Sequence, residues 1–561
     1  MKTLGALDYA VFLTYFFIVA IYGWWIYRKK KAQEESSKDF FLAKDSLTWW
    51  AIGASLIASN ISAEQFIGMS GSGFKMGLAI ATYEWMAAVT LIIVAVFFIP
   101  VYLKNKIFTM PQFLHQRYNG TVAMIMAVFW LLLYVVVNLT SILYLGALAI
   151  NSISGINLTV CMYLLALFSV IITLGGMKVI GYTDVIQVFF LILGGLATTY
   201  LALDLVATHF GSSGVLQGFN HLTEQAESHF QMILKKDNEN YLDLPGLTVL
   251  IGGMWIVNLN YWGCNQYITQ RALGADLATA RKGLLFASFL KLLMPVIVVL
   301  PGIAAYVLYK EGYGDFKTAM HSDGEVLPDT AYPVLLNLLP SGLKGLSFAA
   351  LTAAVVASLA GKANSIATIF TLDIYKKVIN KDAHEDKQVN VGRYAVIASM
   401  LIAIVIAPML GIDKKGGFQF IQEYTGFFSP GIFAMFLLGF FWKKTTSNAA
   451  LFATIGGFAL SVGFKFLPFV MDLSFLYSTG FSIPVVQSDG AVLYEIPFLD
   501  RMGFVFIICV GVMFIISIYE TQKGIIAKGL KIEKEMFYTS KSFAAISLIL
   551  LGLIAALYTI Y

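Results

Sequence analysis

The chain has 561 residues, of which 58% are hydrophobic and 13% are charged, and its mean hydropathy is +0.76. Soluble domains carry about twice this share of charge, so the composition excludes a soluble enzyme or binding domain and indicates an integral membrane protein. The net charge of +5 is no nucleic-acid signature, because most basic residues lie in short loops between apolar runs. Three cysteines far apart in the sequence imply neither a disulfide framework nor a metal cluster.

Apolar runs of about twenty residues predict membrane-spanning helices, since barrel strands would alternate over about ten residues. The first run is too long for a signal peptide and precedes its basic cluster, so we predict a first span with the N-terminus outside. We predict about fourteen spans, at residues 7–27, 47–70, 78–101, 121–150, 158–177, 183–207, 246–265, 284–309, 341–375, 392–410, 416–441, 447–468, 500–520 and 542–560.

Basic residues concentrate in the loops on one side of these spans, such as 28–46 and 266–283. The opposite loops are poor in them: residues 208–245 contain only two lysines and residues 469–499 none. The positive-inside rule then places both termini outside a plasma (inner) membrane. Residues 208–245 and 310–340 become candidate external caps.

The second span carries a polar cluster at its centre, within residues 55–68: Ser59, Asn60, Ser62, Glu64 and Gln65. Polar groups at that depth are costly unless they are paired or face a cavity. We predict that the helix breaks there and lines a binding site, the alternative being polar contacts between packed helices.

A second interrupted span, residues 252–263, contains Gly252, Gly253, Asn258 and Asn260. It is the seventh span, five after the first broken one, so the two halves enter the membrane from opposite sides. Matched breaks in inverted halves are typical of secondary transporters. We therefore predict an all-α protein with a 5+5 inverted-repeat core. The predicted divisions are 1–46 (first helix and loop), 47–207 (first repeat), 208–245 (external loop), 246–441 (second repeat) and 442–561 (peripheral helices).

Ionisable residues occupy the spans that follow the two breaks: Glu84 in the third span and Lys291 in the eighth. Opposite charges on equivalent helices suggest one shared site, the alternative being an ion pair that only fixes packing. Gln422 is a third polar intrusion. Together with nearby aromatic residues, these groups suit a neutral polyol such as a sugar.

The ninth span places Ala354, Ser358 and Lys362 on one helix face. A carbonyl and a hydroxyl there could join carbonyls near Ala58 and Ile61 in an oxygen cage for a monovalent cation. The alternative for Ser358 is a hydroxyl bonded to its own helix.

The stretches 58–73, 83–86, 183–190, 265–268, 367–375 and 422–426 resemble the sodium/solute symporter family, within about residues 40 to 445. The resemblance implies the leucine-transporter fold and a transporter, not an enzyme. It implies sugar contacts from Gln65, Glu84, Asn258, Lys291 and Gln422. It also implies an inner gate at Tyr261 and an outer gate at Met69, Tyr83 and Phe418. Sodium would be held by the carbonyls of Ala58, Ile61 and Ala354 and the Ser358 hydroxyl, with Asp184 on the exit path.

Three positions depart from the family pattern: Ala87, Ala357 and Lys362. Ala87 replaces a serine that contacts sugar, and Ala357 replaces one of two adjacent sodium-binding serines. We hypothesise that Lys362 pairs with Asp184, closing the exit or replacing part of the cation's charge.

The sequence therefore predicts a sodium-coupled hexose symporter in the lipid bilayer, working by alternating access, without nucleic acid. The alternatives are a proton-coupled or uncoupled carrier in which Lys362 replaces the cation, a symporter of another small solute, and a sugar sensor that transports nothing.

Overall fold

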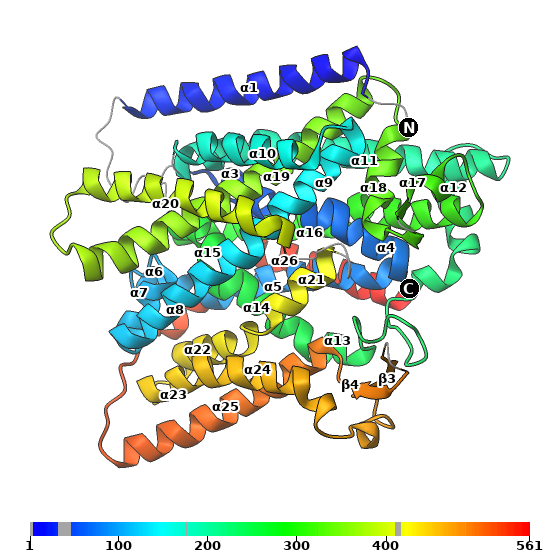
Figure 1. Cartoon of the computed structure of the whole chain (residues 1–561). Coiled ribbons are helices and arrows are strands. Elements are labelled where there is room, and N and C mark those ends of the chain that lie inside the picture. The colour runs from blue at the N-terminus through cyan, green and yellow to red at the C-terminus, as the bar shows by residue number, and fades with distance from the viewer. Residues whose placement is uncertain (1–3, 32–46, 176, 323, 410–416, 488–489) are drawn as a thin grey trace.

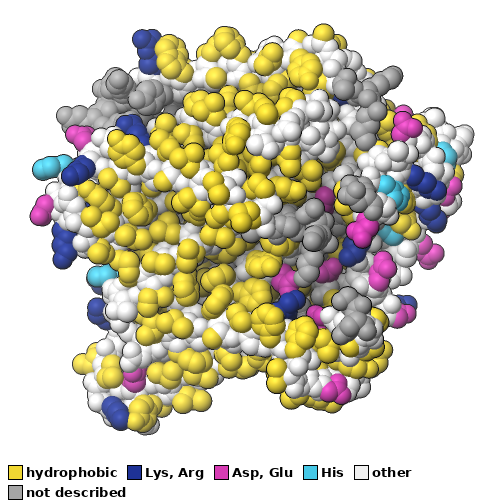
Figure 2. All heavy atoms as spheres, viewed as in Figure 1, with side chains coloured by type: hydrophobic (Ala, Val, Ile, Leu, Met, Phe, Trp, Pro, Cys, Tyr) yellow, Lys and Arg dark blue, Asp and Glu magenta, His cyan; other side chains and the backbone are white. Residues whose placement is uncertain are grey.

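The computed structural model describes residues 4–31, 47–175, 177–322, 324–409, 417–487 and 490–561. Helices run side by side across most of it (Figure 1). In the space-filling view, charged side chains gather mainly toward the two edges where helices end, and the face between them is largely hydrophobic (Figure 2). A belt of this kind fits a bilayer, which confirms the predicted membrane protein. The predicted loop 32–46 lies outside the described residues.

Among the described residues, ten helices are long and apolar enough to cross a membrane, or eleven if a pair bent by 51° forms one span. Helix fills each of the fourteen predicted ranges, but several are broken or short, so the number fourteen stays a prediction. The long spans include α1 (Ala6–Lys31), α11 (Met177–His209), α16 (Leu277–Lys310), α19 (Leu343–Thr368) with η7 (Ile369–Ile379), α20 (Glu385–Ile406), α25 (Phe498–Gln522) and α26 (Lys541–Ile560).

Other spans are built from consecutive segments. They are α5 (Thr82–Ile93) with η3 (Val94–Phe98) and α6 (Ile99–Lys104), α8 (Gly120–Leu132) with η4 (Leu133–Leu139) and α9 (Thr140–Ser154), α21 (Gly417–Gly426) with α22 (Ser429–Phe441), and α23 (Ser447–Leu451) with η10 (Phe452–Gly456) and α24 (Gly457–Phe466). The single helix α10 (Leu158–Thr173) is apolar but shorter. The helix α7 (Met110–Arg117) connects α6 to α8.

The first predicted break is present. Helix α3 (Trp49–Asn60) ends where Ile61 turns extended (φ −84°, ψ 109°), and the chain resumes as the π-helix η1 (Glu64–Met69). It then continues through α4 (Ser70–Met76) and the short 3-10 helix η2 (Gly77–Ala81). The break therefore lies within the polar cluster.

The second break is also present at Gly252, one of the predicted positions, whereas the predicted interruptions at Asn258 and Asn260 are wrong. Helix α13 (Leu247–Ile251) stops at Gly252, and α14 (Gly253–Cys264) ends at the extended Asn265 before α15 (Gln266–Leu273). The chain stays helical through Asn258 and Asn260, because their side-chain amides find partners without breaking the helix. Asn258 Nδ2 donates to the Met254 carbonyl (3.1 Å), and Asn260 Nδ2 donates to Ser429 Oγ (3.1 Å).

The predicted external caps cover one end of the bundle. They comprise α12 (Val215–Gln225), η5 (Glu227–Phe230), α17 (Phe316–Ala319), η6 (Pro328–Thr330) and α18 (Ala331–Leu338), with the hairpins β1–β2 (His321–Ser322 with Glu325–Val326) and β3–β4 (Ile483–Val486 with Val492–Glu495).

Both ends of the described chain lie beside these caps. Asp8 near the start of α1 accepts hydrogen bonds from the amides of Gly342 (2.7 Å) and Gly345 (3.0 Å). The carbonyl of Tyr561 accepts one from the Met232 amide (3.2 Å). The start of α1 and the end of α26 therefore share a side with the predicted external loops (Figure 1).

Glycines allow the broken helix to pack closely on α16. A Cβ at Gly53 would lie 2.7 Å from the Gly283 carbonyl oxygen, and one at Gly302 would overlap the Ser70 carbonyl oxygen. In both places the obstacle is backbone, which a side-chain rotation cannot relieve. The position of the broken helix therefore depends on these small residues.

We expect Gly302→Ala to lower the free energy of unfolding by about 1–3 kcal/mol, because α16 and α4 must separate to accept the methyl group. Thermal unfolding of the detergent-solubilised protein measures this. The control is Gly463→Ala in α24, where a Cβ meets nothing within 4 Å and the protein should be as stable or slightly more so. Equal stability of the two variants would contradict the close approach.

Candidate functional site

A small polar cavity lies at the first break, enclosed by η1, α5, α14, α16, α19 and α21. Its volume is about 60 Å³. The lining residues are Asn60, Glu64, Gln65, Tyr83, Glu84, Ala87, Asn138, Val257, Asn258, Tyr261, Trp262, Asn265, Lys291, Lys362, Phe418, Ile421, Gln422 and Thr425. All five predicted sugar-binding residues are among them, so the structure brings together residues that are hundreds of positions apart.

Three larger cavities, each above 500 Å³, also lie among the described residues. One is lined mainly by apolar side chains of α8, η4, α21 and α24, and another by those of α1 and α10. The third, of about 940 Å³, lies between the start of α1 and the segments around α17 and α18, and none of its lining residues belongs to a broken helix. Recognition of a polar solute needs several convergent polar groups. The small cavity is therefore the candidate site.

Glu84 and Lys291 form the strongest contact in the cavity. Lys291 Nζ lies 2.5 Å from Glu84 Oε2, and the two side chains are 1% and 3% exposed for lysine and glutamate respectively. Lys291 also donates a hydrogen bond to Asn60 Oδ1 and lies 5.2 Å from the centre of the Trp262 ring. The two charges that we expected at one site are thus in contact, with a third partner from the broken helix.

Tyr261, the predicted inner gate, is held from two sides. Its hydroxyl accepts a hydrogen bond from Asn60 Nδ2 (3.1 Å) and donates to the Tyr267 hydroxyl (3.4 Å). Because Asn60 also accepts from Lys291, the gate is linked to the ion pair through one side chain. A sugar that competes for Lys291 would therefore also disturb Tyr261.

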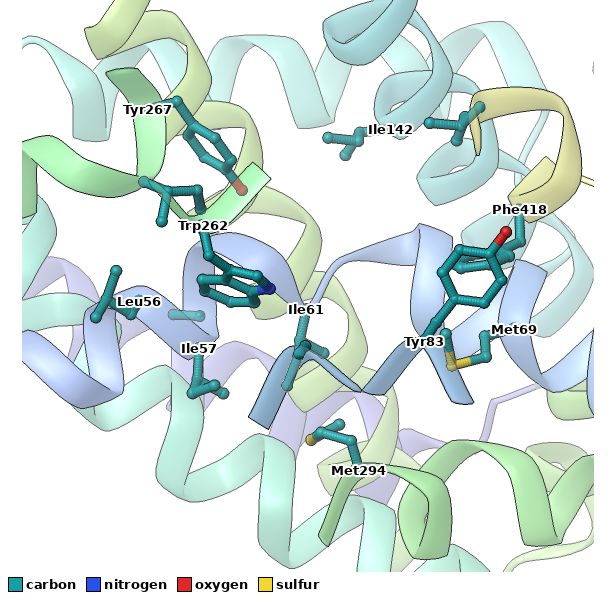
Figure 3. Packing of buried hydrophobic residues seen from close by; sticks show 14 of the residues in the cluster. Leu56, Ile57, Ile61, Met69, Tyr83, Ile142, Trp262, Tyr267, Met294 and Phe418 are labelled. Carbon is teal, nitrogen blue, oxygen red and sulfur yellow. The ribbon is translucent and has the colours of Figure 1, made fainter. Parts of the chain in front are cut away.

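The predicted outer-gate residues lie together at the other end of the cavity (Figure 3). The rings of Tyr83 and Phe418 meet edge to face with 5.0 Å between their centres, and Met69 lies beside Tyr83. Phe418 can approach η1 this closely because residue 68 is a glycine. A Cβ at Gly68 would lie only 2.7 Å from the Phe418 amide nitrogen. Tyr83 and Phe418 line the cavity here, and Met69 packs behind them (Figure 3).

An acidic residue of the external cap holds the start of α21, the helix that carries Phe418. Asp329 Oδ2 accepts a hydrogen bond from the Gly417 amide (2.7 Å), and Asp329 is 9% exposed. Burial raises the pKa of this carboxyl to about 7, although the Gly417 amide lowers it in part. Sequence reasoning missed this anchor, because nothing in the polar loop 310–340 marks one aspartate as buried.

The predicted pairing of Lys362 with Asp184 is wrong. Lys362 Nζ lies 3.7 Å from Glu64 Oε1 and 4.9 Å from the centre of the Tyr267 ring, so it faces the cavity. Asp184 instead accepts a hydrogen bond from Ser55 Oγ (2.6 Å), which in turn accepts from Arg271 Nε (2.9 Å). The intervening arginine occupies the position the hypothesis gave to Lys362.

The predicted sodium-binding backbone is freed by the break. In a continuing helix the Ser62 amide would bond the Ala58 carbonyl, but it donates to Gln65 Oε1 (3.1 Å). The Gln65 amide likewise bonds the Ser62 carbonyl (3.1 Å) instead of Ile61. Ser358 Oγ on α19 donates to the Ser59 carbonyl (3.0 Å), which brings Ala354 and Ser358 against this stretch. Neutral oxygens of this kind suit a monovalent cation.

Several cavity residues were not assigned a role from sequence: Asn60, Glu64, Asn138, Asn265 and Thr425. Asn60 and Glu64 belong to the polar cluster that predicts the break, so their signal was visible. Asn265 is the extended residue between α14 and α15, and its side chain accepts from the Tyr134 hydroxyl. Asn138 follows an apolar run, and a single polar residue there more often bonds to a neighbouring helix. Thr425 follows Gln422 and Glu423 in the same helix, so its polar surroundings were visible in the sequence.

A polar cavity at a helix break within a membrane bundle is typical of a secondary transporter. The chain belongs to the sodium:solute symporter family, whose model matches residues 40–457. It is 46% identical to the sodium/glucose cotransporter of Vibrio parahaemolyticus, over 100% of this chain and 98% of the relative.

More distant relatives are also sodium cotransporters by name. The chain is 32% identical to human sodium/myo-inositol cotransporter 2, over 82% of this chain and 70% of the relative. It is 30% identical to sheep sodium/glucose cotransporter 1, over 92% and 79% respectively. A solved outward-open structure of a sodium-coupled sialic acid symporter aligns over 94% of this chain and 100% of that chain with a TM-score of 0.75. At 20% identity this likeness shows the fold alone, and the fold is the predicted leucine-transporter fold.

The Asp329 carboxyl predicts a pH-dependent stability. Its pKa is raised above the ordinary 3.8, so the folded protein binds this proton more tightly than the unfolded chain and loses stability as the pH rises toward about 7. Asn at this position can still accept from Gly417 without an ionisation cost. We expect Asp329→Asn to gain a few degrees in Tm relative to the natural protein between about pH 5 and about pH 8. If Tm plotted against pH gave parallel curves for Asp329→Asn and the natural protein, this prediction would be wrong.

Proposed function

We propose that the protein carries a neutral hexose of the galactose or glucose type across the membrane together with sodium. The observation that carries the proposal is the buried Glu84–Lys291 pair, which lies in the cavity between the two gates. Each partner offers a sugar hydroxyl a charge-assisted hydrogen bond. A sugar hydroxyl can take the place of either partner in the Glu84–Lys291 pair, so the site binds a neutral sugar tightly while the pair itself carries no net charge.

The charge balance of the cavity favours an uncharged cargo. Its lining includes two glutamates and two lysines, together with the amides of Gln65, Asn258 and Gln422. The aromatic rings of Tyr83, Trp262 and Phe418 supply apolar faces, as a pyranose ring requires. The named cargoes of the relatives, glucose and myo-inositol, are neutral polyols of this kind.

Alternating access follows from the size of the cavity. At about 60 Å³ it is well below the roughly 300 Å³ of a small-molecule pocket, so a hexose enters only if the surrounding helices separate. Opening the outer gate needs Phe418 to leave Tyr83, and opening the inner one needs Tyr261 to leave Asn60. Because Asn60 belongs to the broken helix, that helix contacts both pathways.

Sodium at the Ala58, Ile61, Ala354 and Ser358 oxygens would supply the driving force. One positive charge crossing the membrane contributes about 2.3 kcal/mol per 100 mV. The freed Ala58 and Ile61 carbonyls support this site. The positive-inside distribution supports termini outside a plasma membrane, and labelling of a tag after Tyr561 by a membrane-impermeant reagent in intact cells would test it.

Uptake of radiolabelled hexose into proteoliposomes tests the function. We expect galactose and glucose uptake to need an inward sodium gradient and to fail in choline. Lys291→Met should reduce kcat/KM by on the order of a hundredfold, because it leaves Glu84 buried without its partner. Lys465→Met, at a lysine outside the cavity that pairs with Glu423 (2.8 Å), is the control.

Equal uptake in choline would contradict sodium coupling and favour the carrier alternative. Absence of hexose uptake with intact myo-inositol or sialic acid uptake would overturn the substrate but leave the transporter. Insensitivity to Lys291→Met would overturn the site.

Restoring the missing hydroxyl tests the sodium site separately. Ala357 precedes Ser358 on α19 and is 1% exposed, so Ala357→Ser would add an oxygen beside the proposed ligands. We expect the sodium concentration for half-maximal uptake to fall by about three- to tenfold, as one further oxygen ligand strengthens cation binding. Ala353→Ser, one turn away on the same helix, is the control. An unchanged sodium requirement would place the cation elsewhere.

A further inference from the structure

The cavity holds a second ion pair, which differs from the first in geometry. Lys362 Nζ and Glu64 Oε1 are 3.7 Å apart, against 2.5 Å for Lys291 and Glu84. Lys362 is 3% exposed and Glu64 12% exposed, and both line the cavity. A separation of 3.7 Å gives electrostatic attraction but is too long for a hydrogen bond.

Glu64 therefore has hydrogen-bonding capacity to spare. Its Oε1 is buried and makes no hydrogen bond with any described residue. A buried charged oxygen that stays unbonded costs stability, so a donor in the cavity would be bound strongly. A hydroxyl between the two side chains could donate to the Glu64 carboxylate and accept from the Lys362 ammonium at once.

The surroundings hold the ammonium toward the cavity. Lys362 Nζ lies 4.9 Å from the centre of the Tyr267 ring, and Tyr267 accepts a hydrogen bond from Tyr261. Tyr261 is linked through Asn60 to Lys291. The two ion pairs thus lie at opposite ends of one polar chain that runs along the cavity wall.

The second pair also joins the same two elements as the proposed sodium site. Lys362 lies one turn beyond Ser358 on α19, and Glu64 begins η1 just after the break. On the sodium side, Ser358 bonds the Ser59 carbonyl at the end of α3. A bridge between Glu64 and Lys362 would hold α19 against the broken helix from the cavity side.

We infer that Glu64 and Lys362 form a second hydroxyl-binding pair, through which one hydroxyl of the sugar bridges the broken helix to α19. This inference rests on the proposed sugar transport. Sodium and sugar then hold the same two elements together on adjacent faces, so each strengthens the binding of the other. Lys362 becomes a specificity-determining residue as well as a link between cargo and ion.

A cycle that changes both protein and ligand tests the bridge. Equilibrium binding of galactose, glucose and each of their monodeoxy analogues is measured at saturating sodium on the purified full chain and on Lys362→Met. For one analogue, the natural protein should lose about tenfold or more in affinity relative to the parent sugar, as for a hydrogen bond to a charged group. In Lys362→Met the parent and that analogue should bind within about twofold of each other.

A sodium titration of the same binding reports the coupling. Sodium should tighten binding of the parent sugar by a smaller factor in Lys362→Met than in the natural protein. For the deoxy analogue that lacks the bridging hydroxyl, sodium should tighten binding by a similar factor in both proteins. Glu64→Gln, which keeps an acceptor but no charge, should show an intermediate effect and serves if Lys362→Met does not fold. Lys377→Met is the control, since that lysine is 40% exposed and pairs with Asp373 instead (2.6 Å).

The inference is overturned if each deoxy analogue loses the same factor in affinity, relative to its parent sugar, in the natural protein and in both variants. Glu64 and Lys362 would then bind only water or only each other. A change in sodium affinity alone, equal for all sugars, would also overturn it and make Lys362 a partner of the cation. If the natural protein binds no hexose, the proposed function itself fails, so the two failures are distinguishable.

Discussion

The unwound turn between α3 and η1 is the constraint on which the rest of the structure depends. No water is present in hydrocarbon to replace lost backbone hydrogen bonds, so a chain can unwind there only if its own groups compensate. Gln65 provides part of that compensation by accepting from the Ser62 amide. The carbonyls of Ala58 and Ile61 are released on the opposite side. The same break therefore frees the carbonyls of the proposed cation site and turns polar side chains toward the cavity.

The two Glu–Lys pairs show how the cavity can be charged and still suit a neutral cargo. Burying four charges is expensive, and an isolated one would be intolerable, but opposite pairs cancel at short range. Glu84 and Lys291 are in full contact, while Glu64 and Lys362 are held apart. The first pair gives an anchor and the second leaves a place for a hydroxyl. Ala87 lines the same cavity.

Movement is built around the same broken helix. It packs on α16 through glycines, contacts α19 through Ser358 and meets the outer gate where Gly68 admits Phe418. Asp329 ties that gate to the external cap, while Ser55, Asp184 and Arg271 join α3 to α11 and α15 at the other end. One rigid displacement of α3 and η1 would therefore alter both gates and both ligand sites together.

The sequence by itself determined the membrane class, the two broken spans and several residues that line the candidate site, because polar groups within apolar spans are too costly to occur without a role. For the same reason it predicted that Glu84 and Lys291 share one site. Only the tertiary structure decided which partners meet: Glu64 with Lys362, Ser55 with Asp184, and Asp329 with Gly417. Helical periodicity gives the face on which a side chain lies, but rotation and depth of each helix are set by packing. Packing thus places Lys362 beside Glu64 and Tyr267, and Arg271 beside Ser55.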